Sequence, residues 1–389
     1  MSQIILKTSN IQLYYFYIAI AFLFPRGFGE YNVAYHQIMK LLVWSSVIII
    51  IVTEIPTIIL NYINKTSLNY ALIASYFISA IIITYFSQNG IESQLQQMIA
   101  VPFLCIFFIN NLKTNAKHLL NCFSLVFIIS LLLNLVLTPI VFGFDTHIIF
   151  LGHVQLVSQY CLSALVISYI YIITYRDNRL KMIVLIVLSL ITMLFTDADS
   201  AVFSALIFLL FILIYKFKFS NLLFFFNIKA LLLCLLILNI IVIYLTAINQ
   251  NIIPGLNFSG RSFVWKEAIL KIKDQPLFGY GMDGVLLEPF WIKLEGGAGF
   301  NYAHNQILQN LLDGGFVLTI LFWIMVWIFI KPIEKIKERK YRVISIYAVI
   351  VLMFIMIFES STIYCYMYIV LSVLHMQKYY IGSNHQKLL

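Results

Sequence analysis

The stretch IMKLLVWSSVIIIIVTEIPTIIL, residues 38–60, holds only two charged side chains, Lys40 and Glu54. A second stretch, ALLLCLLILNIIVIYLTAI at residues 230–248, holds none. Each is long enough to cross the ~30 Å hydrocarbon core of a bilayer as a helix, which takes about 20 residues. Neither alternates apolar and polar residues over ~10 positions, as a strand of a transmembrane barrel does. Both stretches therefore predict membrane-spanning helices.

The chain as a whole is also unusually apolar. Of its 389 residues, 62% are hydrophobic and 11% are charged, whereas soluble domains contain roughly 45–50% and about 25%. We therefore predict an all-α, polytopic integral membrane protein, a single domain over residues 1–389 with about 12 transmembrane helices. The predicted spans are residues 8–24, 38–60, 68–86, 98–112, 119–141, 149–175, 182–196, 200–215, 230–248, 306–330, 343–358 and 361–378.

The basic residues predict which way the chain crosses the membrane. With these spans, 18 of the 25 Lys and Arg residues fall on the side that holds both termini, and five of the others lie in one long loop. Because basic residues collect in short cytoplasmic loops, we expect both termini in the cytoplasm. The cations are spread over many segments and form no single stripe, so nucleic acid is not an expected partner.

The long loop, residues 249–305, joins the ninth and tenth predicted spans on the outer side of the membrane. Loops of this length are uncommon unless they are functional or disordered. Phe263, Trp265, Phe278, Phe290 and Trp291 make this one too aromatic for disorder. We therefore expect the loop to fold against the membrane and to carry the active site.

The first motif in the loop is SGRSFVWKEAILKIKDQP, residues 259–276, which predicts an amphipathic helix. Two roles are open for it. The helix can lie on the bilayer, where Trp265, Lys266 and Lys271 suit the interface and anionic membrane lipid. Alternatively, Arg261 at the helix start can grip phosphate oxygens with its planar fork, with the two lysines as further substrate-binding cations.

The later motifs are rich in glycine and end at a histidine. PLFGYGMDG, residues 276–284, is typical of a tight turn and lacks the Lys-Ser/Thr of a phosphate-binding P-loop. Gly296, Gly297 and Gly299 then lead to AHNQILQNLLDGG, residues 303–315. His304 and Asn305 therefore fall at the outer mouth of a span. An imidazole there can exchange a proton near neutral pH, or simply form an interfacial hydrogen bond.

Further polar residues lie within the predicted spans and at their outer ends. Gln155 and Gln159 are four residues apart in FLGHVQLVSQYC, residues 150–161, and so share a helix face. We expect them either to join helices or to line a groove for substrate. Asp197 and Asp199 in LFTDADSAVFSAL, residues 194–206, either bind sugar hydroxyls or form an exposed turn.

Taken together, the motifs from Gly260 to Gly315 resemble those of the bacterial O-antigen polymerase and O-antigen ligase superfamily. The shared features are GR, a following Trp, PLFGYG and AHNQILQNLLDGG, together with about 12 spans, cytoplasmic termini and one large, late periplasmic loop. The resemblance implies the fold of lipid-carrier-dependent (C-type) glycosyltransferases and a location in the bacterial inner membrane.

The resemblance also implies a reaction. A hydroxyl of one glycan would attack the anomeric carbon of another glycan held on undecaprenyl pyrophosphate, with inversion and with no cofactor or metal. His304 matches the family histidine thought to act as the base, and Arg261 matches the arginine thought to bind the pyrophosphate. A second family arginine is absent, because Asp199 stands at about its position. Lys266, Lys271 or Arg26 is a possible substitute for its charge.

Three functions remain open at this stage. We favour a polymerase that joins lipid-linked oligosaccharide repeat units, with a chain-length regulator and a flippase as possible partners. The first alternative is a ligase that transfers the finished polymer to lipid A-core. The second is a transporter or flippase, which the absence of repeated halves disfavours.

Overall fold

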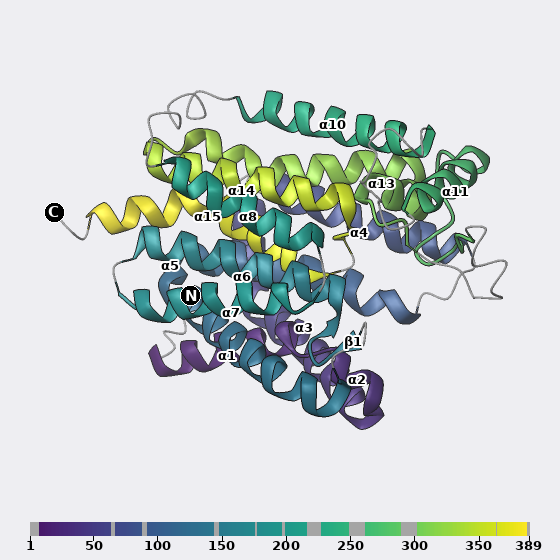
Figure 1. The fold of residues 1–389 in the computed structure, drawn as a ribbon. Coiled ribbons are helices and arrows are strands. Elements are labelled where there is room, and N and C mark those ends of the chain that lie inside the picture. Colours follow the sequence, from purple (N-terminus) through teal and green to yellow (C-terminus); the bar gives the residue numbers. More distant parts are fainter. Residues whose placement is uncertain are drawn as a thin grey trace.

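A computed structural model of the chain describes a bundle of helices (Figure 1). The described residues are 8–63, 67–87, 92–143, 148–175, 177–196, 199–215, 227–248, 261–288, 302–362 and 364–386. Several predicted features therefore lie outside them: Asp197, the glycines Gly296, Gly297 and Gly299, and residues 249–260 and 289–301 of the long loop.

The elements within these ranges are nearly all helical, as the sequence predicts. The α-helices are α1 (Thr8–Leu23), α2 (Gly27–Tyr31), α3 (Val33–Ile63), α4 (Ser67–Phe86), α5 (Glu92–Leu137), α6 (Val154–Thr174), α7 (Arg179–Leu194), α8 (Asp199–Tyr215), α10 (Ile228–Ile248), α11 (Arg261–Asp274), α13 (Gln306–Ile330), α14 (Arg339–Phe358) and α15 (Cys365–Gln386). A π-helical turn η1 (Thr138–Phe142), a 3-10 turn η2 (Lys331–Lys335) and a hairpin of β1 (Ile148–Ile149) and β2 (Gly152–His153) complete them.

Helix α5 is two helices joined at a sharp bend. Its backbone leaves the helical region at Asn115. The rings of Phe108 and Phe123 lie 4.7 Å apart, although 15 residues of straight helix would separate them by about 22 Å. The chain therefore folds back at Asn115. The predicted spans 98–112 and 119–141 are the two arms of this bend.

The burial pattern separates inner from outer helices. Most residues of α6 and α14 are buried, whereas α10 runs along one edge of the bundle and exposes Leu233, Ile237 and Ile240 (Figure 1). Large exposed apolar faces are unusual in soluble proteins and are expected where a helix faces lipid. Six helical stretches in the described residues are long and apolar enough to cross a membrane.

Contacts between basic connections identify one end of the bundle. Gln12 near the start of α1 lies 3.2 Å from His118, just past the bend of α5. Nearby, Lys117 pairs with Asp177 before α7, and Lys340 at the start of α14 donates to the carbonyl of Ile173. These connections are the ones that the basic residues predict to be cytoplasmic, and they lie together.

The opposite end of the bundle contains α2 and the small hairpin. The backbone N–H groups of Arg26 and Phe28 donate to the carbonyls of Leu151 and Phe150. These bonds fix the turn after α1 against the entry to α6. Helix α6 begins there with His153 as its N-cap, whose side chain accepts from the N–H of Gln155 at 3.4 Å.

Candidate active site

Three charged or titratable side chains meet at this end of the bundle. The Glu359 carboxylate, just after α14, accepts a hydrogen bond from Arg261 Nη2 at 2.9 Å. Its other oxygen lies 3.5 Å from His304 Nδ1. Glu359 is only 4% exposed in its side chain, His304 11% and Arg261 18%. The structure thus places the two predicted catalytic residues on one buried carboxylate.

Two further side chains complete the cluster. Ser200 in the first turn of α8 donates to Glu359 at 3.3 Å, and Gln155 Nε2 on α6 lies 3.2 Å from His304 Nδ1. Five segments that are distant in sequence therefore contribute one residue each. We call Arg261, His304, Glu359, Ser200 and Gln155 the active-site cluster.

Helix α11 holds Arg261 by packing against protein. Its buried face consists of Val264, Trp265, Ala268 and Ile272, so the helix is amphipathic as the sequence predicts. Trp265 is fully buried, and its Nε1 donates to the carbonyl of Ala303 at 2.9 Å. The prediction that Trp265 suits the bilayer interface is therefore wrong, because this face packs onto α10 and α13.

Arg261 retains binding capacity beyond its ion pair. Its Nε–H is buried and has no hydrogen-bond partner among the described residues. A buried donor without a partner is costly, and a phosphate oxygen is an acceptor that the guanidinium fork fits. The side chain can therefore hold Glu359 through Nη2 and offer its Nε–H to an anion.

The backbone of His304 is held in a conformation that few side chains adopt. Its φ is 50°, in the left-handed region that costs a non-glycine residue about 1–2 kcal/mol. The neighbouring residue is clamped on both sides: the N–H of Ala303 donates to Gln309 at 2.8 Å, and its carbonyl accepts from Trp265. Strain of this kind concentrates at functional sites.

A tyrosine packs beside the imidazole. The rings of Tyr302 and His304 lie 4.3 Å apart, edge to face. Burial, and after it the negative charge of Glu359, raises the pKa of Tyr302 to about 12. At neutral pH this tyrosine is therefore an uncharged wall of the site.

The residues after His304 form the start of α13 and tie it to its surroundings. Asn305 is the N-cap, and its side chain accepts from the N–H groups of Ile307 and Leu308 while its amide donates to Asn239 and the carbonyl of Ile357. Gln306 Oε1 accepts from the backbone of Ser361 and Thr362, which lie two and three residues after Glu359. The amide side chains of this motif thus position both His304 and the carboxylate.

The motif PLFGYG forms backbone hydrogen bonds with the end of AHNQILQNLLDGG, at a break in α13. The helix is interrupted at Gly314 and Gly315, where φ and ψ leave the helical region. The freed carbonyls of Leu312 and Asp313 accept from Tyr280 and Gly281, and the freed N–H groups of Phe316 and Val317 donate to Pro276 and Leu277. The segment PLFGYG therefore completes the hydrogen bonding of the broken helix, which a simple tight turn does not do.

Two of these glycines have no room for a side chain. A Cβ on Gly279 would lie 2.4 Å from the carbonyl oxygen of Leu312, and one on Gly315 would lie 2.2 Å from the carbonyl carbon of Leu277. Both also have φ near +60°, which favours glycine. The glycines permit a backbone contact that fixes α11 relative to α13, and hence Arg261 relative to His304.

The remaining predicted residues lie on α6, α8 and α11, helices that also carry residues of the cluster. Lys266 is exposed and Lys271 half-buried, away from the buried face of α11. Asp199 is exposed in the first turn of α8, beside Ser200. Gln159 is buried one turn beyond Gln155, and its Oε1 has no partner among the described residues.

Sequence reasoning missed two residues of the cluster, Ser200 and, with more consequence, Glu359. In sequence it is one of several acidic residues on the predicted outer side. One signal could have found it. A carboxylate between two apolar spans and directly before SST, residues 360–362, is an expensive position unless a cation meets it.

These observations define a multi-pass membrane protein with a buried Arg–Glu–His cluster at one end of its helices. Residues 184–323 match the family model described as O-antigen ligase. The match runs from α7 into α13 and contains Arg261 and His304, whereas Glu359 lies beyond it. It confirms the resemblance to the O-antigen polymerase and ligase superfamily, whose members are glycosyltransferase-like enzymes. A comparison with curated proteins finds no match.

Proposed function

We propose that the protein is an O-antigen polymerase, or polymerase of a related surface polysaccharide, in the bacterial inner membrane with both termini in the cytoplasm. It joins oligosaccharide repeat units carried on undecaprenyl pyrophosphate, on the periplasmic face and without a metal. The observation that carries this proposal is the ion pair of Arg261 with Glu359, which places a phosphate-binding fork and an imidazole around one carboxylate.

The reaction needs one proton transfer and one leaving group. The hydroxyl oxygen of the acceptor glycan attacks the anomeric carbon of the donor and forms the new glycosidic bond. The bond from that carbon to the diphosphate oxygen breaks from the opposite face, so the configuration inverts. The acceptor proton passes to His304, and the electron pair leaves with undecaprenyl pyrophosphate.

Each residue of the cluster has a role in this step. With a proton on Nδ1 facing Glu359, and with the Gln155 amide oxygen turned toward that N–H, the lone pair of His304 lies on Nε2. There it can act as a general base, worth roughly 10²–10⁴ in rate. Arg261 stabilises the charge that develops on the departing diphosphate. Glu359 keeps both side chains in place, as the carboxylate does in other catalytic triads.

A gel of the cell-surface glycan after deletion of the gene tests this assignment. Lipid A-core that carries a single repeat unit supports the polymerase. Loss of all repeats from the core, with polymer accumulating on the lipid carrier, identifies a ligase, as the description of the matching family suggests. An unchanged ladder excludes both. Polymer synthesis by the purified protein should also be unaffected by a chelator.

A further inference from the structure

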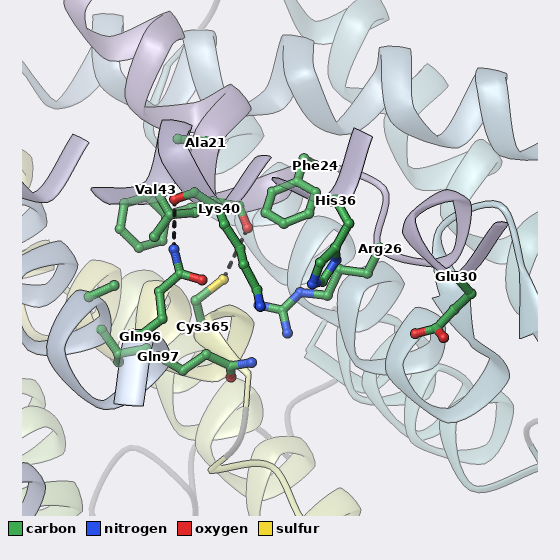
Figure 2. A pocket seen from close by; sticks show the side chains of 13 residues that line it. Ala21, Phe24, Arg26, Glu30, His36, Lys40, Val43, Gln96, Gln97 and Cys365 are labelled. Carbon is green, nitrogen blue, oxygen red and sulfur yellow. Dashed lines mark hydrogen bonds between the residues drawn. The ribbon is translucent and has the colours of Figure 1, made fainter. Parts of the chain in front are cut away.

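A second basic site lies at the same end of the bundle, in a pocket of about 280 Å³ between α1, α3, α5 and α15 (Figure 2). Arg26, His36 and Lys40 line it, and Figure 2 shows these three side chains pointing toward one another. Gln96 lies across from them and donates to the carbonyl of Lys40 at 2.8 Å. Among the described residues of the lining, the only acidic one is Glu30, which is exposed and stands apart in the view.

Apart from Gln97 and Cys365, the other described residues of the pocket lining are apolar. Phe22, Val43, Ala100 and Val101 belong to helices of the bundle and face the same cavity. A basic mouth over an apolar wall suits a molecule that has phosphate groups and a hydrocarbon chain. The volume is near the lower end of the roughly 300–1,000 Å³ that small-molecule sites occupy, which is room for a head group and the start of a chain.

Two routes connect this pocket to the active-site cluster. The Arg26 guanidinium lies over the ring of Tyr364, 5.5 Å from its centre, and Tyr364 is close enough to Tyr302 to influence its ionisation. The backbone of Arg26 is also bonded to Leu151, at the entry to the helix that carries Gln155. The pocket is therefore a neighbour of His304 and Arg261 while sharing no residue with the cluster.

We propose that this pocket binds the diphosphate of a second lipid-linked glycan, the acceptor, while Arg261 binds that of the donor. This inference rests on the proposed polymerase function, since joining two lipid-linked repeat units brings two diphosphates to the same end of the protein. Arg26 and Lys40 supply the charge, His36 and Gln96 supply hydrogen-bond donors, and the apolar wall receives the first part of the lipid.

Direct binding tests the pocket without relying on activity. Purified protein in phosphatidylcholine nanodiscs is titrated with undecaprenyl pyrophosphate by native mass spectrometry. We expect two lipids per protein, and one in an Arg261→Gln variant. In that variant, adding Arg26→Gln or Lys40→Met should weaken the remaining site about tenfold, as expected for the loss of a charged hydrogen bond. Lys273→Met, which removes an exposed lysine from α11, is the matched control.

The titration has three outcomes that count against the proposal. Unchanged binding in the Arg26 and Lys40 variants overturns the proposal. Equal competition by phosphatidylglycerol in the nanodisc also overturns it and makes the pocket a general phospholipid site. Equal competition by inorganic diphosphate shows that the lipid is not recognised. Because the titration measures binding alone, it remains decisive even if the protein proves to be a ligase.

Activity then separates the acceptor site from the donor site. With lipid-linked repeat units as the only substrate, Lys40→Met should raise KM about tenfold with kcat within about threefold of wild type. A variant that lowers kcat strongly and leaves KM unchanged would place Lys40 in the chemical step, contrary to the proposal.

Discussion

Replacement of Glu359 by Gln keeps the size of the side chain and removes the charge that Arg261 and His304 share. Arg261 now donates to a neutral amide oxygen. A hydrogen bond to a charged group contributes about 1.5–3 kcal/mol and a neutral one about 0.5–1.5 kcal/mol, so the loss is about 1–1.5 kcal/mol, or roughly 5- to 13-fold in rate. Glu359→Ala leaves the guanidinium without this acceptor. Breaking a buried pair costs about 3–5 kcal/mol, and because Arg261 is 18% exposed we expect the lower part of that range.

The assay is polymer synthesis from lipid-linked repeat units by purified variants, with thermal unfolding measured in parallel. Glu359→Gln should remain folded and should lose kcat rather than raise KM. Glu334→Gln, at η2 away from the active-site cluster, is the control and should match wild type. A folded Glu359→Gln variant with the wild-type rate would show that the carboxylate only fills space, and would refute its positioning role.

The glycine packing, the Arg261 side chain and the distribution of basic residues each lead to a further prediction. Gly279→Ala should destabilise the protein by more than about 3 kcal/mol, because its Cβ meets the Leu312 carbonyl at 2.4 Å. Gly143→Ala, with positive φ but open space, should cost only about 1–2 kcal/mol, and equal unfolding temperatures would disprove the close approach. Arg261→Lys should reduce polymer synthesis more than about tenfold, since an ammonium cannot form the two-pronged contact, and full activity at matched protein levels would return Arg261 to a structural role. Reporter fusions test the topology. Fusions after Lys117, Arg179 and Lys337 should give a cytoplasmic signal, and a fusion after Glu288 should give a periplasmic signal. A cytoplasmic signal after Glu288 would invert the assigned orientation.

Many of the helices could be predicted from the sequence, because a helix buried in lipid requires a long run of apolar residues. Long apolar runs predict spans, and α10, for example, occupies residues 228–248 where the apolar run predicts 230–248. The bend at Asn115 is also implied, because Lys113 and Lys117 interrupt two apolar runs. Local composition does not reveal the hairpin of β1 and β2, whose pairing depends on the turn after α1.

Only part of the candidate site could be predicted from the sequence, because its residues meet through tertiary contacts. Arg261, His304 and Gln155 were predicted and lie in the cluster. Glu359 reaches them from beyond the motif region, and no local pattern links it to Arg261, 98 positions earlier. Trp265 was placed at the bilayer because an amphipathic face looks the same whether lipid or another helix covers it.

The most direct test of the account is the product ladder made by His304→Gln from lipid-linked repeat units. Glutamine retains a hydrogen-bonding side chain but cannot accept the acceptor proton at neutral pH. His304→Gly is the companion variant, because relief of the positive φ should offset the lost contact with Tyr302 and keep the unfolding temperature within about 2 °C of wild type. We predict that both variants are folded and that neither extends the glycan. A ladder formed by folded His304→Gln at a near wild-type rate would contradict the assignment of His304 as the base.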